Sequence, residues 1–149
     1  SGTGGTIAGV GAALKERNKS VKIVLSDPKG SCLYNHIKNG ELKSEGNSIT
    51  EGIGSSRITK NFEKAPIDDA YSINDNDALS VLFELLETEG LNLGTSSGIN
   101  IAGAIKLAEN LGPNHTIVTI LCDTSDKYKS KMFNKKFLKD KGLPYPKWL

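Results

Sequence analysis

The feature that most constrains the fold is the glycine-rich run Ser-Gly-Thr-Gly-Gly-Thr at residues 1–6, which leads directly into an apolar helical stretch. Glycines let the backbone approach an anion closely, and the first turn of the helix offers unpaired N–H groups and the positive end of its dipole. Such a loop normally follows a buried strand, and no strand precedes it here. We therefore expect a phosphate-binding loop, and we interpret the chain as the rear portion of something longer.

Two common phosphate motifs do not match this loop. The dinucleotide fingerprint needs a third glycine where Ile7 stands, and the Gly-Lys-Ser/Thr ending of a Walker A loop is absent. What remains is a short run of backbone donors flanked by the hydroxyls of Thr3 and Thr6, sized for one phosphate monoester. An ordinary tight strand-to-helix turn stays an open alternative. Without the third glycine, Asp27 is interpreted as a turn former and not as a ribose-binding acid.

The composition narrows the class of protein. A chain of 149 residues suits one domain or a piece of a two-domain enzyme. The hydrophobic content of 37% and charged content of 24% are typical of a soluble globular protein, and a net charge of +2 does not favour nucleic acid. Cys32 and Cys122 have neither disulfide nor metal-ligand spacing, which favours a reducing cytoplasm and no metal. No apolar run approaches the roughly 20 residues of a membrane span.

Hydrophobic periodicity predicts helices that alternate with strands. The helices are expected at 6–17, from Asn74 or Asp75 to Gly90, from the Gly94–Gly98 loop to Gly112, and at 133–141, and the strands at 21–25 and 116–121. The stretch 32–54 is predicted to be a loop around at most one short helix. This alternation indicates an α/β fold with a mostly parallel sheet and helices on both faces.

Two further loops carry candidate functional residues. In Gly94-Thr95-Ser96-Ser97-Gly98, a serine hydroxyl could hold a ligand nitrogen, while the alternative is that Ser96 or Ser97 caps the next helix. In Glu51-Gly52-Ile53-Gly54, paired glycines could bring the backbone close to a ligand, and a flexible surface turn is the alternative.

Taken in order, these loops and the Ile-Leu-Cys-Asp run at 120–123 resemble the second half of the cysteine synthase (O-acetylserine sulfhydrylase) and cystathionine β-synthase family. These are pyridoxal-phosphate enzymes of fold type II, and the resemblance covers essentially the whole chain. It implies an α/β fold, pyridoxal 5′-phosphate as the cofactor, and residues 1–149 as the C-terminal, phosphate-loop-bearing portion of an enzyme whose N-terminal half is absent.

The resemblance also implies a role for each candidate residue. The cofactor's phosphate would be held by Gly2, Thr3, Gly4, Gly5 and Thr6. Ser96 would hydrogen-bond the pyridine nitrogen, with Ser97 as its neighbour and possible substitute, and Asp123 would support the ring. Gly52, Ile53 and Gly54 would lie against the amino-acid substrate. The motif after Cys122 departs from the family pattern at Ser125 and Lys127, and Ser55-Ser56-Arg57 departs after the glycine pair.

The implied reaction is a β-replacement that makes cysteine from O-acetylserine and sulfide. The lysine that forms the Schiff base with the cofactor belongs to the missing N-terminal half, so no catalytic residue is assigned here and the fragment alone should be inactive. The complete enzyme is expected to be a homodimer. The alternatives are another lyase of the same family, such as a cystathionine β-synthase or a serine/threonine dehydratase, and a non-catalytic phosphate- or nucleotide-binding module.

Overall fold

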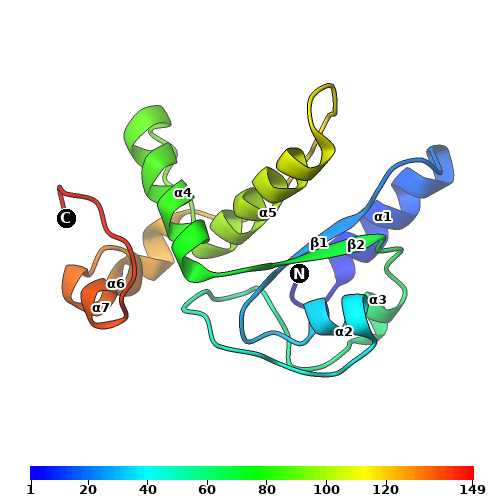
Figure 1. The fold of residues 1–149 in the computed structure, drawn as a ribbon, viewed down its shortest axis with the longest axis horizontal. Coiled ribbons are helices and arrows are strands. Elements are labelled where there is room, and N and C mark those ends of the chain that lie inside the picture. The colour runs from blue at the N-terminus through cyan, green and yellow to red at the C-terminus, as the bar shows by residue number, and fades with distance from the viewer. The chain divides into compact units, whose positions relative to one another are not determined.

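A computed structural model describes residues 1–149, and Figure 1 labels its helices and strands. The chain forms two compact units. Unit 1 comprises residues 1–47 and 52–72, and unit 2 comprises residues 48–51 and 73–149. Each unit is described by itself.

Unit 1 holds a short parallel sheet with three helices. Its elements are α1 (Gly5–Arg17), β1 (Val24–Pro28), α2 (Leu33–Asn39), α3 (Lys60–Glu63) and β2 (Asp69–Ile73). The last residue of β2, Ile73, is assigned to unit 2. β1 pairs with β2, and the two strands run in the same direction (Figure 1). A parallel pair needs a crossover connection, which the chain makes through α2 and α3. The core of this unit is apolar, and its buried residues are Leu25, Cys32, Leu33, Phe62 and Ala70.

Unit 2 is helical. Its elements are α4 (Asp75–Glu89), α5 (Thr95–Leu111), the 3₁₀ helix η1 (Ser125–Tyr128), α6 (Lys129–Met132) and α7 (Lys135–Asp140). α4 and α5 pack against each other, and the end of the chain covers α4 with apolar side chains. The buried core consists of Leu79, Leu82, Phe83, Tyr128, Met132 and Leu138.

The predicted α/β class with a parallel sheet is confirmed, and so are the long helices. α4 begins as its sequence indicates, because the side chain of Asn74 accepts a hydrogen bond from the backbone N–H of Asp77 at 2.8 Å. It ends at Gly90, whose φ of 68° is favourable only for glycine and a few polar residues. The loop at 32–54 contains one short helix, α2, as expected. No helix is long and apolar enough to cross a membrane.

The strand predicted at 116–121 is wrong. These residues have no regular secondary structure, and the side chain of Val118 is 85% exposed. A β-branched run forms a strand only where a neighbouring strand completes its hydrogen bonds, and no other segment of the chain pairs with it. The carbonyl oxygen of Ile120 accepts a hydrogen bond from the Asn100 side chain at 2.9 Å instead. The helix predicted at 133–141 is shorter, since α7 spans Lys135–Asp140.

Asp27 is not the turn former that the sequence indicated. It lies within β1 and is fully buried, and its Oδ2 accepts a hydrogen bond from the backbone N–H of Tyr34 at 2.8 Å. Burial raises the pKa of the Asp27 carboxyl above its usual value, although the bond from Tyr34 opposes this. Asp27 therefore links the end of β1 to the first turn of α2.

Candidate functional site

The predicted phosphate loop lies at the start of α1. Gly4 is the N-cap residue, with a φ of 83°, and no side chain caps the helix. The first hydrogen bond of α1 runs from the backbone N–H of Ala8 to the carbonyl oxygen of Gly4 at 3.0 Å, so the N–H groups of residues 5–7 have no partner in the helix. Thr3, Gly5 and Thr6 are exposed to solvent. The helix therefore presents free donors to a ligand.

Gly4 is the residue that sets the shape of this loop. A Cβ atom at Gly4 would lie 2.6 Å from the Cα of Phe62, which is far closer than atoms can approach. The positive φ adds a second restriction, because side chains other than glycine rarely adopt it. The loop is therefore pressed against the backbone of α3, and only glycine fits there.

Two carbonyl groups of the loop are held from outside it. The backbone N–H of Gly54 donates to the carbonyl oxygen of Ser1 at 2.8 Å, and the hydroxyl of Thr59 donates to the carbonyl oxygen of Thr3 at 2.5 Å. In a trans peptide the N–H points opposite to the preceding C=O, so these bonds direct the N–H groups of Gly2 and Gly4 away from the contacts. The arrangement fits an anion such as a phosphate group, since the carbonyl oxygens of Ser1 and Thr3 are occupied while backbone N–H donors remain without a partner in the helix.

The predicted substrate loop lies beside the phosphate loop within unit 1. A Cβ atom on Gly2 would lie 3.2 Å from the carbonyl oxygen of Gly52, and the N–H of Gly54 makes the bond to Ser1 just described. Gly54 has a φ of 84°, and a Cβ there would stand 2.9 Å from Pro28. The structure thus brings the two loops together, with Ile53 half-buried between the glycines.

The double serine lies at the start of α5 in unit 2. The N-cap residue is Gly94, so the alternative in which Ser96 or Ser97 caps the helix is wrong. The Ser97 hydroxyl is fully buried and accepts a hydrogen bond from the backbone N–H of Cys122 at 2.9 Å. The Thr95 hydroxyl accepts from the N–H of Glu51 at 3.5 Å. The Ser96 hydroxyl makes no hydrogen bond within the chain, which leaves it available to a ligand.

Asp123 lies directly against the start of α5. Its carbonyl oxygen accepts a hydrogen bond from the N–H of Gly94 at 2.8 Å, and its Oδ2 accepts from the hydroxyl of Tyr128 at 2.7 Å. This bond, together with burial, raises the pKa of Tyr128 to about 12. The other carboxylate oxygen of Asp123 is buried without a partner, and a Cβ on Gly94 would lie 2.1 Å from it. Within unit 2 the structure therefore brings Asp123 and the double serine together.

Comparison with known proteins decides the family. Residues 1–123 match the model of the family described as "Pyridoxal-phosphate dependent enzyme". The chain belongs to this pyridoxal-phosphate dependent family.

The similarity to known relatives extends over most of this chain. The chain is 40% identical to cysteine synthase 2 of Schizosaccharomyces pombe over 96% of its residues, and 38% identical to the O-acetylserine dependent cystathionine beta-synthase of Bacillus subtilis over 88%. The crystal structure of the O-acetylserine dependent cystathionine beta-synthase from Helicobacter pylori aligns with a TM-score of 0.74 and 36% identity. The alignment covers 86% of this chain and 40% of the Helicobacter pylori chain. The hydrogen sulfide-producing enzyme from Fusobacterium nucleatum aligns with a TM-score of 0.75 and 32% identity. The chain spans about 40% of the length of the curated relatives.

Pyridoxal phosphate is the cofactor of the family, and the residues present fit one end of it. The loop at 2–6 provides close backbone approach at Gly4 and uncapped N–H groups, which are the features that a phosphate monoester requires. Sequence reasoning found these glycines. It missed Thr59, because nothing in the local sequence connects that residue with a loop 56 positions earlier.

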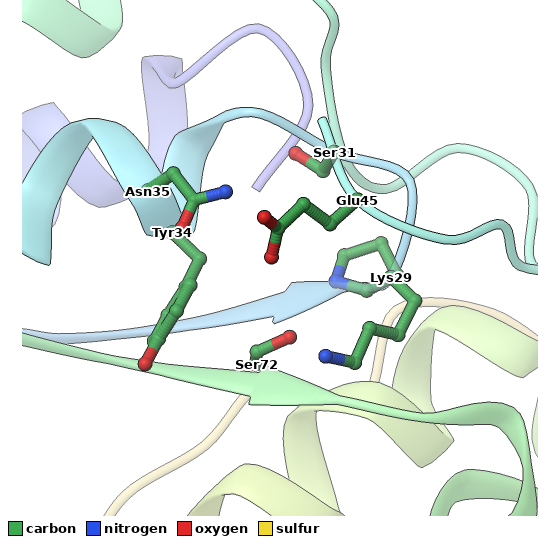
Figure 2. Close-up of a pocket in the computed structure, with 7 residues that line it drawn as sticks. Lys29, Ser31, Tyr34, Asn35, Glu45 and Ser72 are labelled. Atoms are coloured by element: carbon green, nitrogen blue, oxygen red, sulfur yellow. The ribbon is translucent and has the colours of Figure 1, made fainter. Parts of the chain in front are cut away.

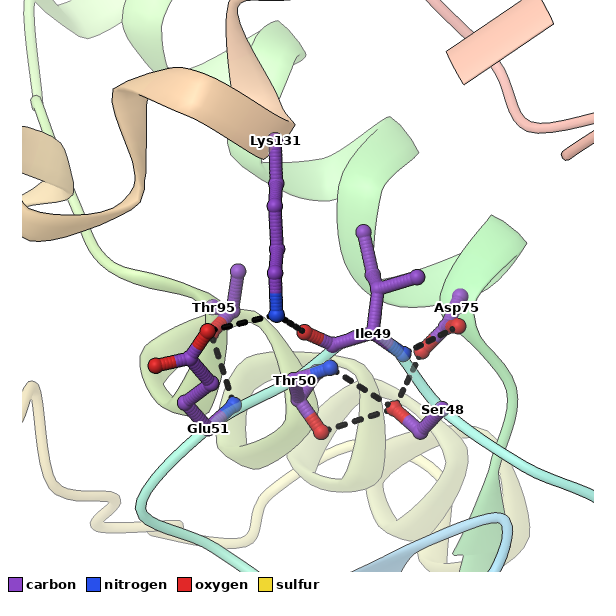
Figure 3. A network of polar contacts seen from close by, with 7 residues as sticks. All are labelled: Ser48, Ile49, Thr50, Glu51, Asp75, Thr95 and Lys131. Atoms are coloured by element: carbon purple, nitrogen blue, oxygen red, sulfur yellow. Dashed lines mark hydrogen bonds and ion pairs between the residues drawn. The ribbon is translucent and has the colours of Figure 1, made fainter. Parts of the chain in front are cut away.

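A second feature that the sequence did not reveal is the set of polar contacts that holds residues 48–51 to the helices of unit 2, of which they are a part (Figure 3). The Asp75 carboxylate accepts hydrogen bonds from the Ser48 hydroxyl and from the N–H of Ile49, at 2.5 and 2.8 Å. The Lys131 ammonium contacts the Glu51 carboxylate at 2.5 Å and the carbonyl oxygen of Ile49 at 3.4 Å. The segment that precedes the glycine pair is thereby fixed to α4 and to α6.

One departure from the family pattern, Ser125, has a structural explanation. Ser125 is fully buried, and its hydroxyl donates to the side-chain oxygen of Asn92, so its side chain joins the start of η1 to the segment between α4 and α5. Figure 2 shows a pocket in unit 1 whose lining includes Lys29, Ser31, Tyr34 and Glu45. It contains none of the loop residues named above, and we assign no role to it.

Proposed function

We propose that the chain is the C-terminal portion of a pyridoxal-phosphate enzyme that makes cysteine from O-acetylserine and sulfide. We call the complete enzyme the parent protein. Its N-terminal half supplies the lysine that binds the cofactor covalently, and the enzyme works as a homodimer in the cytoplasm. The proposal rests on family membership together with the shape of the loop at the start of α1.

The observation that carries the proposal is the set of free donors in the phosphate loop. The carbonyl oxygens of Ser1 and Thr3 are occupied by other hydrogen bonds, whereas the N–H groups at the start of α1 are not. Gly2, Thr3, Gly4, Gly5 and Thr6 would bind the phosphate through these N–H groups and through the two threonine hydroxyls. Charge-assisted bonds of this kind are about twice as strong as neutral ones.

The remaining candidate residues would orient the cofactor ring and the substrate. Ser96 would donate a hydrogen bond to the pyridine nitrogen. We favour Ser96 over Ser97 for this role because the Ser96 hydroxyl has no partner within the chain, whereas the Ser97 hydroxyl already accepts from the N–H of Cys122. A neutral hydroxyl holds the ring nitrogen without a fixed charge, which suits elimination and replacement over transamination. Asp123 would keep the start of α5 in place, and Gly52, Ile53 and Gly54 would contact the amino-acid substrate. When bound, the cofactor supplies an electron sink for the substrate's α-carbon.

The names of the relatives support O-acetylserine as the substrate. Two of them are described as O-acetylserine dependent cystathionine beta-synthases, and several others as cysteine synthases. The second candidate function is therefore cystathionine synthesis from the same donor. The two functions differ in the nucleophile, which is sulfide for cysteine and homocysteine for cystathionine.

Purified parent protein offers a direct test. It is incubated with O-acetylserine and either sulfide or homocysteine, and cysteine and cystathionine are quantified by mass spectrometry. We expect cysteine formation that is lost when the cofactor is removed and that returns with pyridoxal 5′-phosphate. Cystathionine as the main product would favour the second candidate. Product formation that does not depend on the cofactor, or no product with either nucleophile, would contradict both.

A further inference from the structure

Thr59 occupies an unusual position beside the phosphate loop, because its hydroxyl makes two hydrogen bonds to different segments. It accepts from the backbone N–H of Phe62 at 3.1 Å, which caps α3, and it donates to the carbonyl oxygen of Thr3 at 2.5 Å. A threonine hydroxyl has a single proton, so the proton is committed to Thr3 while a lone pair serves the helix. The residue therefore joins the start of α3 to the loop.

The loop and α3 also meet at a second point, where Gly4 lies against the backbone of Phe62. Phe62 is buried in the core of unit 1, and its Cα stands 2.6 Å from the position of a Cβ on Gly4. The backbone of α3 thus contacts the loop at Gly4, while the Thr59 hydroxyl is hydrogen-bonded to the carbonyl group of Thr3, the residue that precedes Gly4. Together the two contacts fix the peptide plane between Thr3 and Gly4 from both sides.

This peptide plane determines where one donor points. The N–H of Gly4 lies opposite to the C=O of Thr3 in a trans peptide. If the carbonyl group lost its hydrogen bond, the plane could rotate and turn an oxygen toward the phosphate position. A carbonyl oxygen there would repel an anion, whereas an N–H attracts it.

We propose that Thr59 is a positioning residue for the phosphate loop, which it holds with its amide donors directed at a phosphate group. The proposal rests on the proposed function, since it concerns the same loop. Thr59 does not contact the cofactor in this scheme. It acts through Thr3, and its loss should weaken recognition of the phosphate group without affecting the rest of the cofactor.

The test compares two probes that differ only in the phosphate group. Pyridoxal 5′-phosphate and pyridoxal are titrated into the parent protein stripped of cofactor, and their dissociation constants are measured by absorbance. We expect Thr59→Val to weaken binding of pyridoxal 5′-phosphate about tenfold, the effect of roughly one hydrogen bond, and to change binding of pyridoxal less than about twofold. Thr59→Ser keeps the hydroxyl and should restore the preference for the phosphorylated form.

A purely structural role for Thr59 predicts a different result. Asn74→Ala removes a helix cap of the same kind from α4 in unit 2, and it serves as the matched control. We expect it to lower the melting temperature without changing the preference for the phosphorylated probe. Thr59→Ala is the second variant if Thr59→Val does not fold. The proposal is overturned if Thr59→Val or Thr59→Ala retains the wild-type preference, or if Asn74→Ala loses it to the same degree.

The wild-type measurement separates this proposal from the proposed function. Wild-type parent protein that binds neither probe, or binds both equally, would overturn the proposed function and this inference with it. A clear wild-type preference that survives the loss of the Thr59 hydroxyl would overturn this inference only.

Discussion

The starts of α1 and α5 are alike in sequence and different in structure. Both helices begin after a glycine, both have threonine or serine in or beside the first turn, and neither has a side-chain cap. At α1, Thr3, Gly5 and Thr6 are exposed, and the N–H groups of residues 5–7 have no partner within the helix. At α5, residues 94–99 are all buried, and two of the three hydroxyls are hydrogen-bond acceptors for other segments.

The two glycines are required for different reasons. Gly4 has a positive φ and a close backbone neighbour, so conformation and space both exclude a side chain. Gly94 has a φ of −78°, which any residue can adopt, and only the Asp123 carboxylate and the Tyr128 ring exclude a side chain there. We infer from this difference that a glycine–hydroxyl loop suits an anion when its carbonyl groups are hydrogen-bonded to other segments, as at α1. It suits a neutral polar group when its hydroxyls are the groups so bonded, as at α5.

The largest effect is expected at the start of α1. Gly4→Ala forces a strained φ, at about 1–2 kcal/mol, and a clash with Phe62 that adds about 1–3 kcal/mol. We expect the free energy of unfolding to fall by the sum of these terms, and the affinity for pyridoxal 5′-phosphate to fall about tenfold or more as donors are displaced. Chemical denaturation and cofactor titration of the parent protein measure the two quantities.

Gly9→Ala is the matched control, because Gly9 lies in the same helix with no atom within 4 Å of its Cβ position. It should stabilise the protein by about 0.5–1 kcal/mol, as alanine does in a helix interior, and leave cofactor affinity unchanged. A Gly4→Ala variant that behaved like Gly9→Ala would show that the loop does not need its backbone shape.

An intermediate effect should separate the two serines of α5. Ser97→Ala leaves the N–H of Cys122 without its acceptor, and we expect a loss of about 1–2 kcal/mol in the free energy of unfolding. Ser96→Ala removes no hydrogen bond, so its stability should stay within about 0.5 kcal/mol of wild type. The absorbance spectrum of the bound cofactor should change in Ser96→Ala and not in Ser97→Ala. Equal stability losses in the two variants would contradict this distinction.

The smallest effect is expected at Tyr128, which supports the α5 start through Asp123. Tyr128→Phe removes one hydrogen bond and should cost about 1 kcal/mol at neutral pH. Because the folded-state pKa of Tyr128 is about 12 against an ordinary 10.0, its contribution is fully present below about pH 10 and is lost as the pH rises through 12.

The measurement is urea denaturation of wild type and Tyr128→Phe at several pH values. The stability difference between them should shrink between pH 10 and 12. Tyr145→Phe changes an exposed tyrosine and should show no such trend. A difference that stays constant over this range would contradict the role of the Asp123 bond.

Much of the fold could be predicted because its signals are local. The limits of α4 follow from Asn74, from the apolar spacing and from Gly90, all within one helix length. The strand expected at 116–121 failed for the opposite reason. Its β-branched residues favour an extended backbone, but pairing depends on a neighbouring strand that the run itself does not encode.

In the candidate site, too, local features could be predicted from the sequence, whereas contacts between distant segments could not. The sequence by itself determined where the glycines and hydroxyls stand, which helices follow them, and the family to which their order belongs. Only the tertiary structure decided that Thr59 binds the carbonyl group of Thr3, that Ser97 is occupied while Ser96 is not, and that Asp27 is buried. The physical reason is distance along the chain. Caps and periodicity act over a few residues, whereas hydrogen-bond partners and burial come from segments 25 or 56 residues apart that meet only on folding.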